Sequence, residues 1–268
     1  MKKFFLLVSI ASIVTTFGCT RIHDSRPTPQ TEHTATTSSR TIDVLDRSNA
    51  MSVRTEAVSY FNSSLGAVRG YYARPEKTGT YPGVIMIHEW WGLNDTIKKM
   101  AESLAAEGYH VLAVDLYHGE VAREAVQARK LVSSLNQSES LRNLAAAQQF
   151  LREHQATQIA SLGWCFGGGQ SLQFALSGRD LAATVLYYGT PVTSTEKLAG
   201  ITWPVLGIFG DKDQSIPIEK IRSFESALIA ARVEHELYVY PGVGHAFANP
   251  TGQNFAPNET KDAWNKTL

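Results

Sequence analysis

The feature that most constrains the fold is the stretch of residues 159–176, in which an apolar run meets a glycine-rich turn and then a helical pattern. The turn has the form Gly-x-Cys-x-Gly and is centred on Cys165. A strand that reverses abruptly into a helix crowds its own backbone at the turn, so small residues are needed on both sides of the apex. Gly163 and Gly167 meet that need, and Cys165 is then the side chain that is free to point outward.

This strand, turn and helix are typical of a nucleophile elbow. The sulfur of Cys165 is expected beside the first turn of the following helix, where unpaired N–H groups and the helix dipole favour a thiolate. The same N–H groups, starting with that of Phe166, are able to receive an oxyanion. The alternative is a core cysteine beside a glycine-rich loop, because free cysteine is among the most buried residue types.

The first 19 residues have the pattern of a bacterial secretory signal. Two lysines precede the apolar run Phe4–Val14, and small or polar residues then lead to Cys19. The run is too short to span a bilayer as a mature helix. A cysteine directly after glycine resembles a lipobox, although Thr16 and Phe17 stand where leucine and a small residue are usual. We predict export to the cell envelope or periplasm and lipidation of Cys19, which would anchor the protein to a membrane; ordinary signal cleavage is the alternative.

The remaining cysteine bears on the role of the elbow. The chain holds two cysteines, so Cys165 has no partner in the chain if Cys19 is lipidated or removed. An unpaired thiol in an oxidising compartment favours a working nucleophile over a structural role. Residues 20–50 are rich in Thr, Ser, Pro and charged residues and predict a flexible tether. We expect one folded domain over residues 51–268.

Within this domain, predicted strands alternate with predicted helices. The chain of 268 residues has a formal net charge of zero, which gives no indication of nucleic-acid binding. The expected strands are 53–60, 65–73, 83–87, 111–114, 159–164, 182–188, 205–209 and 236–240, and the expected helices are 95–106, 121–135, 138–154, 170–176 and 217–231. The first two strands predict an antiparallel pair joined by a turn at 62–64. The rest predict an α/β protein with a mainly parallel, doubly wound sheet covered by helices on both faces, and such sheets carry their sites at the carboxyl ends of the strands.

Two of these strand ends carry an acid and a histidine. Asp211 and Asp213 follow the strand at 205–209, and His245 follows the strand at 236–240. The order nucleophile, acid, base along the chain is that of α/β-hydrolases. A thiol must lose its proton to attack an acyl carbon, an imidazole can take that proton, and a carboxylate orients the imidazole. Spacing leaves the choice between the two aspartates open, because residues two apart in an extended turn point the same way.

The strand at 83–87 also ends in polar and aromatic residues. In this class of fold the loop at this position supplies the second oxyanion donor, and the backbone N–H of Trp90 is the candidate. Packing in a lid is an equal alternative for Trp90 and Trp91. Glu89 is unusual at the mouth of a sheet, because a buried carboxylate is costly without a partner; the alternative is an acid on a surface loop.

Five blocks taken together resemble the dienelactone hydrolase family of α/β-hydrolases. They are Ile87-His88-Glu89-Trp90-Trp91-Gly92-Leu93-Asn94, Asp115-Leu116-Tyr117, Gly163-Trp164-Cys165-Phe166-Gly167-Gly168, Gly210-Asp211-Lys212-Asp213 with Pro217, and Gly244-His245-Ala246-Phe247. The resemblance implies that Cys165 is the nucleophile, His245 the base, and Asp213 rather than Asp211 the orienting acid. It also implies that Glu89 holds the resting thiol and releases it when substrate binds, which would protect the thiol from oxidation.

The sequence departs from the family pattern in two places. Family members grip a substrate carboxylate with two arginines, and the corresponding positions here are Gly119 and Asn249. Without that fork a dienelactone substrate is in doubt, although Arg123 is a nearby weak substitute. Relatives continue a closing helix where this sequence ends, at residues 263–268, so we expect a clipped C-terminus.

These observations predict a hydrolase that cleaves a small ester or lactone through an acyl-cysteine intermediate. No metal or organic cofactor is expected, because no cluster of His, Asp and Glu has ligand spacing. Two alternatives remain. One is an envelope protein that keeps the fold as a non-catalytic binding module, and the other is an enzyme that passes the acyl group to an acceptor other than water.

Overall fold

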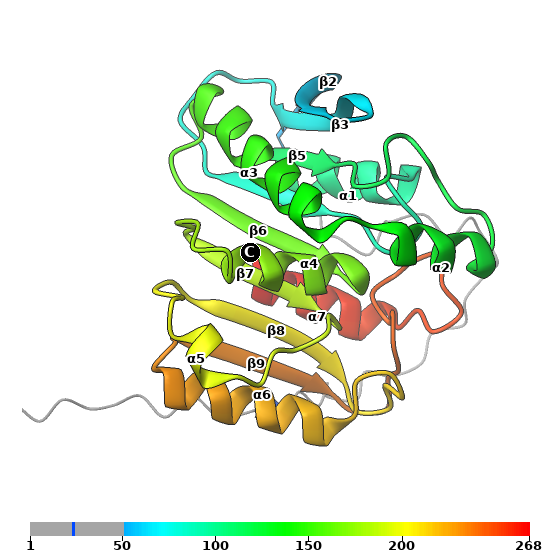
Figure 1. Cartoon of the computed structure of the whole chain (residues 1–268), viewed down its shortest axis with the longest axis vertical. Helices are drawn as coiled ribbons and strands as arrows, with labels where there is room; N and C mark the ends of the chain where they lie inside the picture. The colour runs from blue at the N-terminus through cyan, green and yellow to red at the C-terminus, as the bar shows by residue number, and fades with distance from the viewer. Residues whose placement is uncertain (1–22, 25–50) are drawn as a thin grey trace, which may run out of the picture.

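The computed structural model describes residues 23–24 and 51–268. The predicted signal segment 1–19, including Cys19, lies outside the described residues, as does the predicted tether apart from residues 23–24. Those two residues form the short strand β1. Residues 51–268 fold around one central sheet (Figure 1).

The sheet has the order β1-β9-β8-β7-β6-β4-β5-β3-β2. Its strands are β1 (His23–Asp24), β2 (Val53–Ser63), β3 (Gly66–Pro75), β4 (Gly83–Ile87), β5 (His110–Val114), β6 (Ile159–Trp164), β7 (Ala183–Tyr187), β8 (Val205–Gly210) and β9 (His235–Tyr240). Neighbouring strands from β5 across to β1 pair in parallel, whereas β3 pairs antiparallel with both β5 and β2. The predicted doubly wound α/β class is confirmed, and the sheet is mainly parallel.

The hairpin β2–β3 differs from its prediction in length and turn. Both strands extend further than expected, and Ser63 pairs with Gly66, so the connection is the two residues 64–65 rather than 62–64. Gly66 has a φ of +113°, a conformation that glycine adopts without steric cost. The hairpin lies at one edge of the sheet (Figure 1).

The helices cover both faces of the sheet. They are α1 (Asp95–Ala106), α2 (Ala125–Ser134), α3 (Gln137–Glu153), α4 (Phe166–Ala175), α5 (Thr195–Leu198), α6 (Ile218–Ala231) and α7 (Pro257–Thr267). Buried side chains of α3, α4, α5 and α6 pack with one face, and those of α1 and α7 pack with the other, in two separate apolar clusters. Figure 1 shows α3, α4 and α6 in front of the sheet and α7 behind it.

Some helix boundaries correct the predictions. Helix α2 begins at Ala125, not at Val121, because the N–H of Ala122 donates to the Trp91 carbonyl and holds this segment against the loop after β4. Helix α4 begins at Phe166, four residues before the expected start. Helices α5 and α7 were not predicted. Among the described residues no helix is both long and apolar enough to cross a bilayer.

Candidate active site

Cys165 lies at the turn between β6 and α4. Its φ is +54° and its ψ is −117°, a strained combination for a residue with a side chain. The turn is tight: a Cβ on Gly163 would lie 2.2 Å from the Gly167 carbonyl oxygen, and a Cβ on Gly167 would lie 2.4 Å from the His88 oxygen. The glycines therefore allow the backbone to close up, and the predicted elbow is present. Cys165 is partly exposed, which excludes a fully buried core cysteine.

His245 lies beside this sulfur although it is 80 residues further along the chain. Its Nε2 is 3.1 Å from the Cys165 Sγ. On the other side of the ring, Nδ1 is 2.7 Å from Oδ2 of Asp213. The three side chains come from the carboxyl ends of β6, β9 and β8, where the parallel arrangement brings them together.

The two aspartates of the loop after β8 have different partners. The Asp213 side chain is fully buried, and its Oδ1 accepts from the N–H groups of Ser215 and Ile216 at 2.8 and 3.0 Å. Asp211 instead accepts from the N–H of Gly242 at 2.7 Å and so joins the loops after β8 and β9. Of the two, Asp213 contacts the histidine.

The environment of His245 favours its charged form. Burial alone would lower its pKa, but the hydrogen bonds and negative charges of Asp213 and Cys165 outweigh burial and raise the pKa to about 10. A ring that gains a proton at Nε2 is thus stabilised by the carboxylate at Nδ1. This arrangement can accept a proton from the thiol and later donate it.

The two predicted oxyanion donors, the N–H groups of Trp90 and Phe166, belong to neighbouring segments. Phe166 begins α4, and Trp90 lies in the loop after β4, which the close approach of Gly167 to His88 brings against the elbow. In the described part of the chain neither the Trp90 nor the Phe166 N–H donates to another group. The indole rings of Trp90 and Trp91 pack edge to face at 4.9 Å, so both residues are also partly buried by each other.

Glu89 is buried and does not contact the thiol. Its Oε2 accepts from Nδ2 of Asn249 at 2.5 Å, and Oδ1 of Asn249 accepts from both the N–H and the hydroxyl of Thr251. Thr251 therefore orients the amide so that its donor faces Glu89. Burial raises the pKa of Glu89 to about 7, against the lowering effects of the His245 charge and the Asn249 bond. The surface-acid alternative for Glu89 is wrong, and a resting contact between Glu89 and Cys165 is not seen.

Sequence reasoning missed the residues that hold the loops beneath the site. His88 is fully buried; its Nδ1 donates to the Glu89 carbonyl at 2.6 Å, and its Nε2 accepts from the Leu116 N–H at 3.2 Å. Burial lowers the His88 pKa, which keeps the ring neutral in this role. Asp115 accepts from the N–H groups of Tyr117 and Gly119, and this turn leaves Gly119 with a φ of +89°. The only signal for His88 and Asp115 in the sequence was that both lie in blocks that resemble the dienelactone hydrolase family.

Tyr188 was also missed. It follows β7 with a φ of +36°, and its ring packs edge to face on His245 at 5.2 Å. Burial raises the pKa of its hydroxyl well above the usual value, and the charges of Glu89 and Cys165 raise it further. Tyr188 thus forms a neutral wall beside the imidazole. Among the described residues no cluster of His, Cys, Asp and Glu could hold a metal ion.

Comparisons with known proteins identify the family. The model of the dienelactone hydrolase family matches residues 68–268. Protein usf of Aquifex pyrophilus is 34% identical over 212 residues, which are 75% of this chain and 91% of that protein. A protein of Synechocystis sp. that is provisionally named carboxymethylenebutenolidase is 30% identical over 237 residues, 80% of this chain and 94% of that protein.

A solved structure is similar to this chain over most of its length. A crystal structure from Klebsiella pneumoniae, provisionally described as a dienelactone hydrolase, superposes with a TM-score of 0.75 and 28% identity and covers 81% of this chain and 97% of that one. The match of the family model spans the elbow, both strand-end loops and the loop after β4. The chain therefore belongs to the dienelactone hydrolase family and is a hydrolase with the α/β-hydrolase fold.

Proposed function

We propose that this protein hydrolyses a small carboxylic ester or lactone, with Cys165 as nucleophile, His245 as general base and Asp213 as the residue that orients His245. The observation that carries the proposal is the continuous chain of contacts from Sγ to Nε2 at 3.1 Å and from Nδ1 to Oδ2 at 2.7 Å. These distances are within reach of proton transfer.

In the first half-reaction, His245 takes the thiol proton and the sulfur attacks the acyl carbon. The carbonyl electrons move to oxygen, and the N–H groups of Trp90 and Phe166 stabilise the oxyanion. When the tetrahedral intermediate collapses, the bond to the ester oxygen breaks and the alkoxide takes the proton from His245. The acyl group remains on Cys165 as a thioester. A lactone ring opens in this step, and its alcohol stays attached to the acyl group.

In the second half-reaction, His245 takes a proton from water, and the resulting hydroxide attacks the thioester. The C–S bond breaks, the carboxylic acid leaves, and the thiolate recovers the proton from the imidazolium. Asp213 keeps Nδ1 protonated throughout, because its buried Oδ2 accepts from that nitrogen. Water as acceptor completes hydrolysis and needs no metal or organic cofactor.

The substrate class follows from the charges in the site. Asn249 and Gly119 supply no cation, and Asn249 is engaged with Glu89. Arg123 is exposed, and its backbone N–H donates to the Gln127 side chain. An uncharged ester or lactone fits this site better than a substrate that carries a carboxylate.

The direct test is an assay of short aryl esters and lactones with the wild type and Cys165→Ala. We expect the variant to lose at least about 10³-fold in kcat, because removal of one triad member leaves only binding and oxyanion stabilisation. Circular dichroism of both proteins controls for folding. Wild-type activity in a folded Cys165→Ala protein would disprove the mechanism, and product analysis with added alcohols separates hydrolysis from acyl transfer.

We also propose that the protein is exported and anchored in the cell envelope by lipid on Cys19. The support is the pattern of the first 19 residues. Incorporation of labelled palmitate in a bacterial host is expected for the wild type and not for Cys19→Ala. A wild-type protein that stays unlabelled in the cytoplasm would contradict this proposal.

A further inference from the structure

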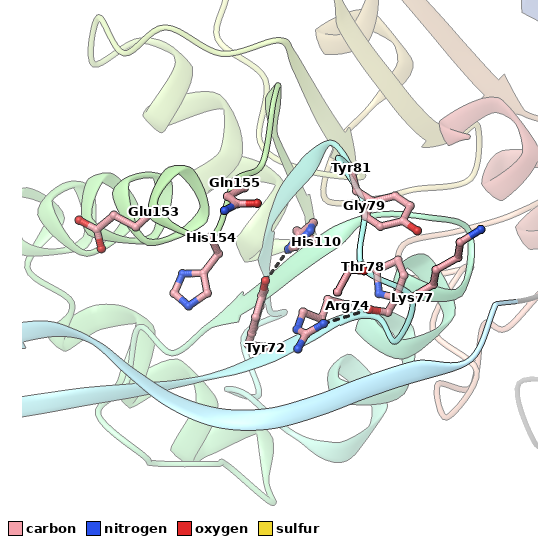
Figure 2. Close-up of a pocket in the computed structure, with 11 residues that line it drawn as sticks. Tyr72, Arg74, Lys77, Thr78, Gly79, Tyr81, His110, Glu153, His154 and Gln155 are labelled. Atoms are coloured by element: carbon pink, nitrogen blue, oxygen red, sulfur yellow. Dashed lines mark hydrogen bonds between the residues drawn. The ribbon is translucent and has the colours of Figure 1, made fainter.

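A cavity lies at the end of the sheet opposite the candidate active site. Its volume is about 320 Å³, and β3, the loop before β4, the start of β5 and the end of α3 form it (Figure 2). His110 is the first residue of β5, whereas Cys165 follows the last residue of the parallel strand β6. The two sites are therefore separated by the length of the strands, and the chemistry at Cys165 does not use this cavity.

The cavity is rich in hydrogen-bond donors. Arg74 comes from β3 and Lys77 from the following loop, while His110 and His154 line the wall (Figure 2). The Arg74 Nη1 donates to the neighbouring Pro75 carbonyl at 3.2 Å. Within residues 51–268, no carboxylate forms an ion pair with Arg74 or Lys77. Both cations thus keep most of their donors for a ligand.

Negative groups at the cavity are few and already engaged. Glu153 is the one carboxylate among the lining residues, and its Oε1 accepts from Gln149 on the same helix at 2.9 Å. Figure 2 shows its carboxylate pointing away from Arg74. The last turn of α3 is also capped, since the Phe150 carbonyl accepts from both the N–H and the Nδ1 of His154. The negative end of the helix is therefore partly neutralised.

His110 supplies a buried donor at the back of the cavity. Its Nδ1 is hydrogen-bonded to the Tyr72 hydroxyl, and a neutral ring that accepts that hydroxyl proton carries its own proton on Nε2. Burial lowers the pKa of His110, and the positive charges of Arg74 and His154 lower it further. The groups around the imidazole thus create a positive potential, which a bound anion would reduce.

Two aromatic rings flank this imidazole. The ring centroids of Tyr72 and Tyr81 lie 5.9 and 5.8 Å from that of His110. Tyrosine rings offer a flat apolar surface next to the charged groups. A ligand with an anionic head and a flat body matches both features, and the volume lies at the small end of the range for ligand pockets.

We propose that this cavity binds a small organic anion, with its carboxylate or phosphate against Arg74, Lys77 and His110. The test is calorimetric titration of the full chain with benzoate and with inorganic phosphate, with uncharged benzamide as control. We expect saturable binding of benzoate with a dissociation constant of about 1 mM or tighter. If phosphate binds with similar affinity, the anionic group supplies most of the binding free energy. If phosphate binds more weakly than benzoate, the tyrosine rings contribute to the binding of the aromatic ring. Absence of saturable binding for both anions, or equal binding of benzamide, would overturn the proposal.

Variants that remove a positive or a negative charge at the cavity should change the affinity for the anion in opposite directions. Arg74→Gln and Lys77→Gln should each weaken anion binding, by about tenfold for Arg74, because a hydrogen bond to a charged group is lost. Glu153→Gln should tighten it by roughly twofold, because a nearby negative charge is removed. Lys77 and Glu153 are exposed, so these two variants test the proposal even if Arg74→Gln folds poorly. Identical affinities in the Lys77 and Glu153 variants would refute it.

A second readout identifies the cavity. Benzoate should raise the pKa of His110 in a histidine NMR titration, and Cys165→Ala should bind benzoate as tightly as the wild type. An unchanged His110 pKa on saturation, or loss of binding in Cys165→Ala, would show that the anion binds at another site and would overturn the inference.

Discussion

Asp211 and Asp213 lie two residues apart in one loop, yet their carboxylates have different hydrogen-bond partners. Asp213 contacts His245, whereas Asp211 accepts from the Gly242 N–H and ties two loops together. Spacing could not separate them, because the choice depends on how the loop after β8 turns against the loop after β9. The resemblance to the family implied Asp213, and the aspartate that is hydrogen-bonded to His245 is Asp213.

We predict that Asp213→Asn lowers kcat/KM by roughly 10² to 10⁴-fold, because the amide no longer stabilises a protonated His245 in the correct tautomer. Asp211→Asn is the matched control: its amide oxygen can still accept from Gly242, so activity should be retained. Steady-state kinetics with an aryl ester measure both. Equal losses in the two variants would contradict the assignment of the acid.

Glu89 predicts a pH dependence of stability. Its folded pKa is raised to about 7 from an ordinary value of 4.5, mainly by burial. The folded state therefore holds a proton that the unfolded state has lost, and the free energy of unfolding should fall as pH rises from 4.5 to about 7. A shift of this size corresponds to roughly 3 kcal/mol.

Urea denaturation of the wild type and Glu89→Gln at about pH 5 and about pH 8 measures this effect, since the neutral amide cannot titrate. We expect the variant to gain stability relative to the wild type as pH rises. Parallel pH profiles for the two proteins would show that burial of Glu89 is not costly. The partnership of Glu89 with Asn249, 160 residues away, could not be predicted from sequence.

At the scale of elements, the close contact between the elbow and the loop after β4 places the two candidate oxyanion donors. Gly167→Ala should destabilise the fold by about 1–3 kcal/mol and lower kcat, because its Cβ would meet the His88 and Ile87 carbonyl oxygens at 2.4 Å. Gly200→Ala is the control, because nothing lies within 4 Å of its Cβ. Thermal unfolding and ester kinetics measure both. A stable, fully active Gly167→Ala would show that this contact does not position the donors.

The elements that sequence reasoning predicted and those that it missed differ in their patterns. Strand β4 and residues 111–114 of β5 are continuous apolar runs buried on both faces, so their type and order could be predicted. Helix α7 is polar over most of its length and buries only Ala263 and Trp264, so few apolar residues mark it as a helix that packs on the sheet. The start of α2 depends on the bond from Ala122 to Trp91, which is a tertiary contact and leaves no local pattern.

At the scale of the molecule, all the residues that form the candidate site lie between His88 and Thr251, within one folded unit. The order of nucleophile, acid and base could be predicted because a parallel sheet brings the ends of β6, β8 and β9 to one edge. The cavity at the opposite end of the strands could not be predicted, since its lining residues come from three separate segments, 72–81, His110 and 153–155.

We predict that a protein without residues 1–50 keeps its fold and its ester hydrolysis, because none of the site residues lies in that segment. Loss of the short pairing of β1 with β9 should lower the melting temperature only slightly. Circular dichroism and kinetics of the shortened and full-length proteins make the comparison. A folded but inactive shortened protein would mean that the N-terminal segment contributes to the site.

The central claim is that Cys165 carries the acyl group during turnover. The most direct measurement is intact-protein mass spectrometry after rapid acid quenching of the enzyme with an aryl acetate, with peptide mapping of the modified residue. The account predicts a burst of phenol no larger than the enzyme concentration, together with one acetyl group on Cys165 that disappears as turnover ends. Turnover at full rate with no acyl group on Cys165, or with the group on another residue, would contradict it.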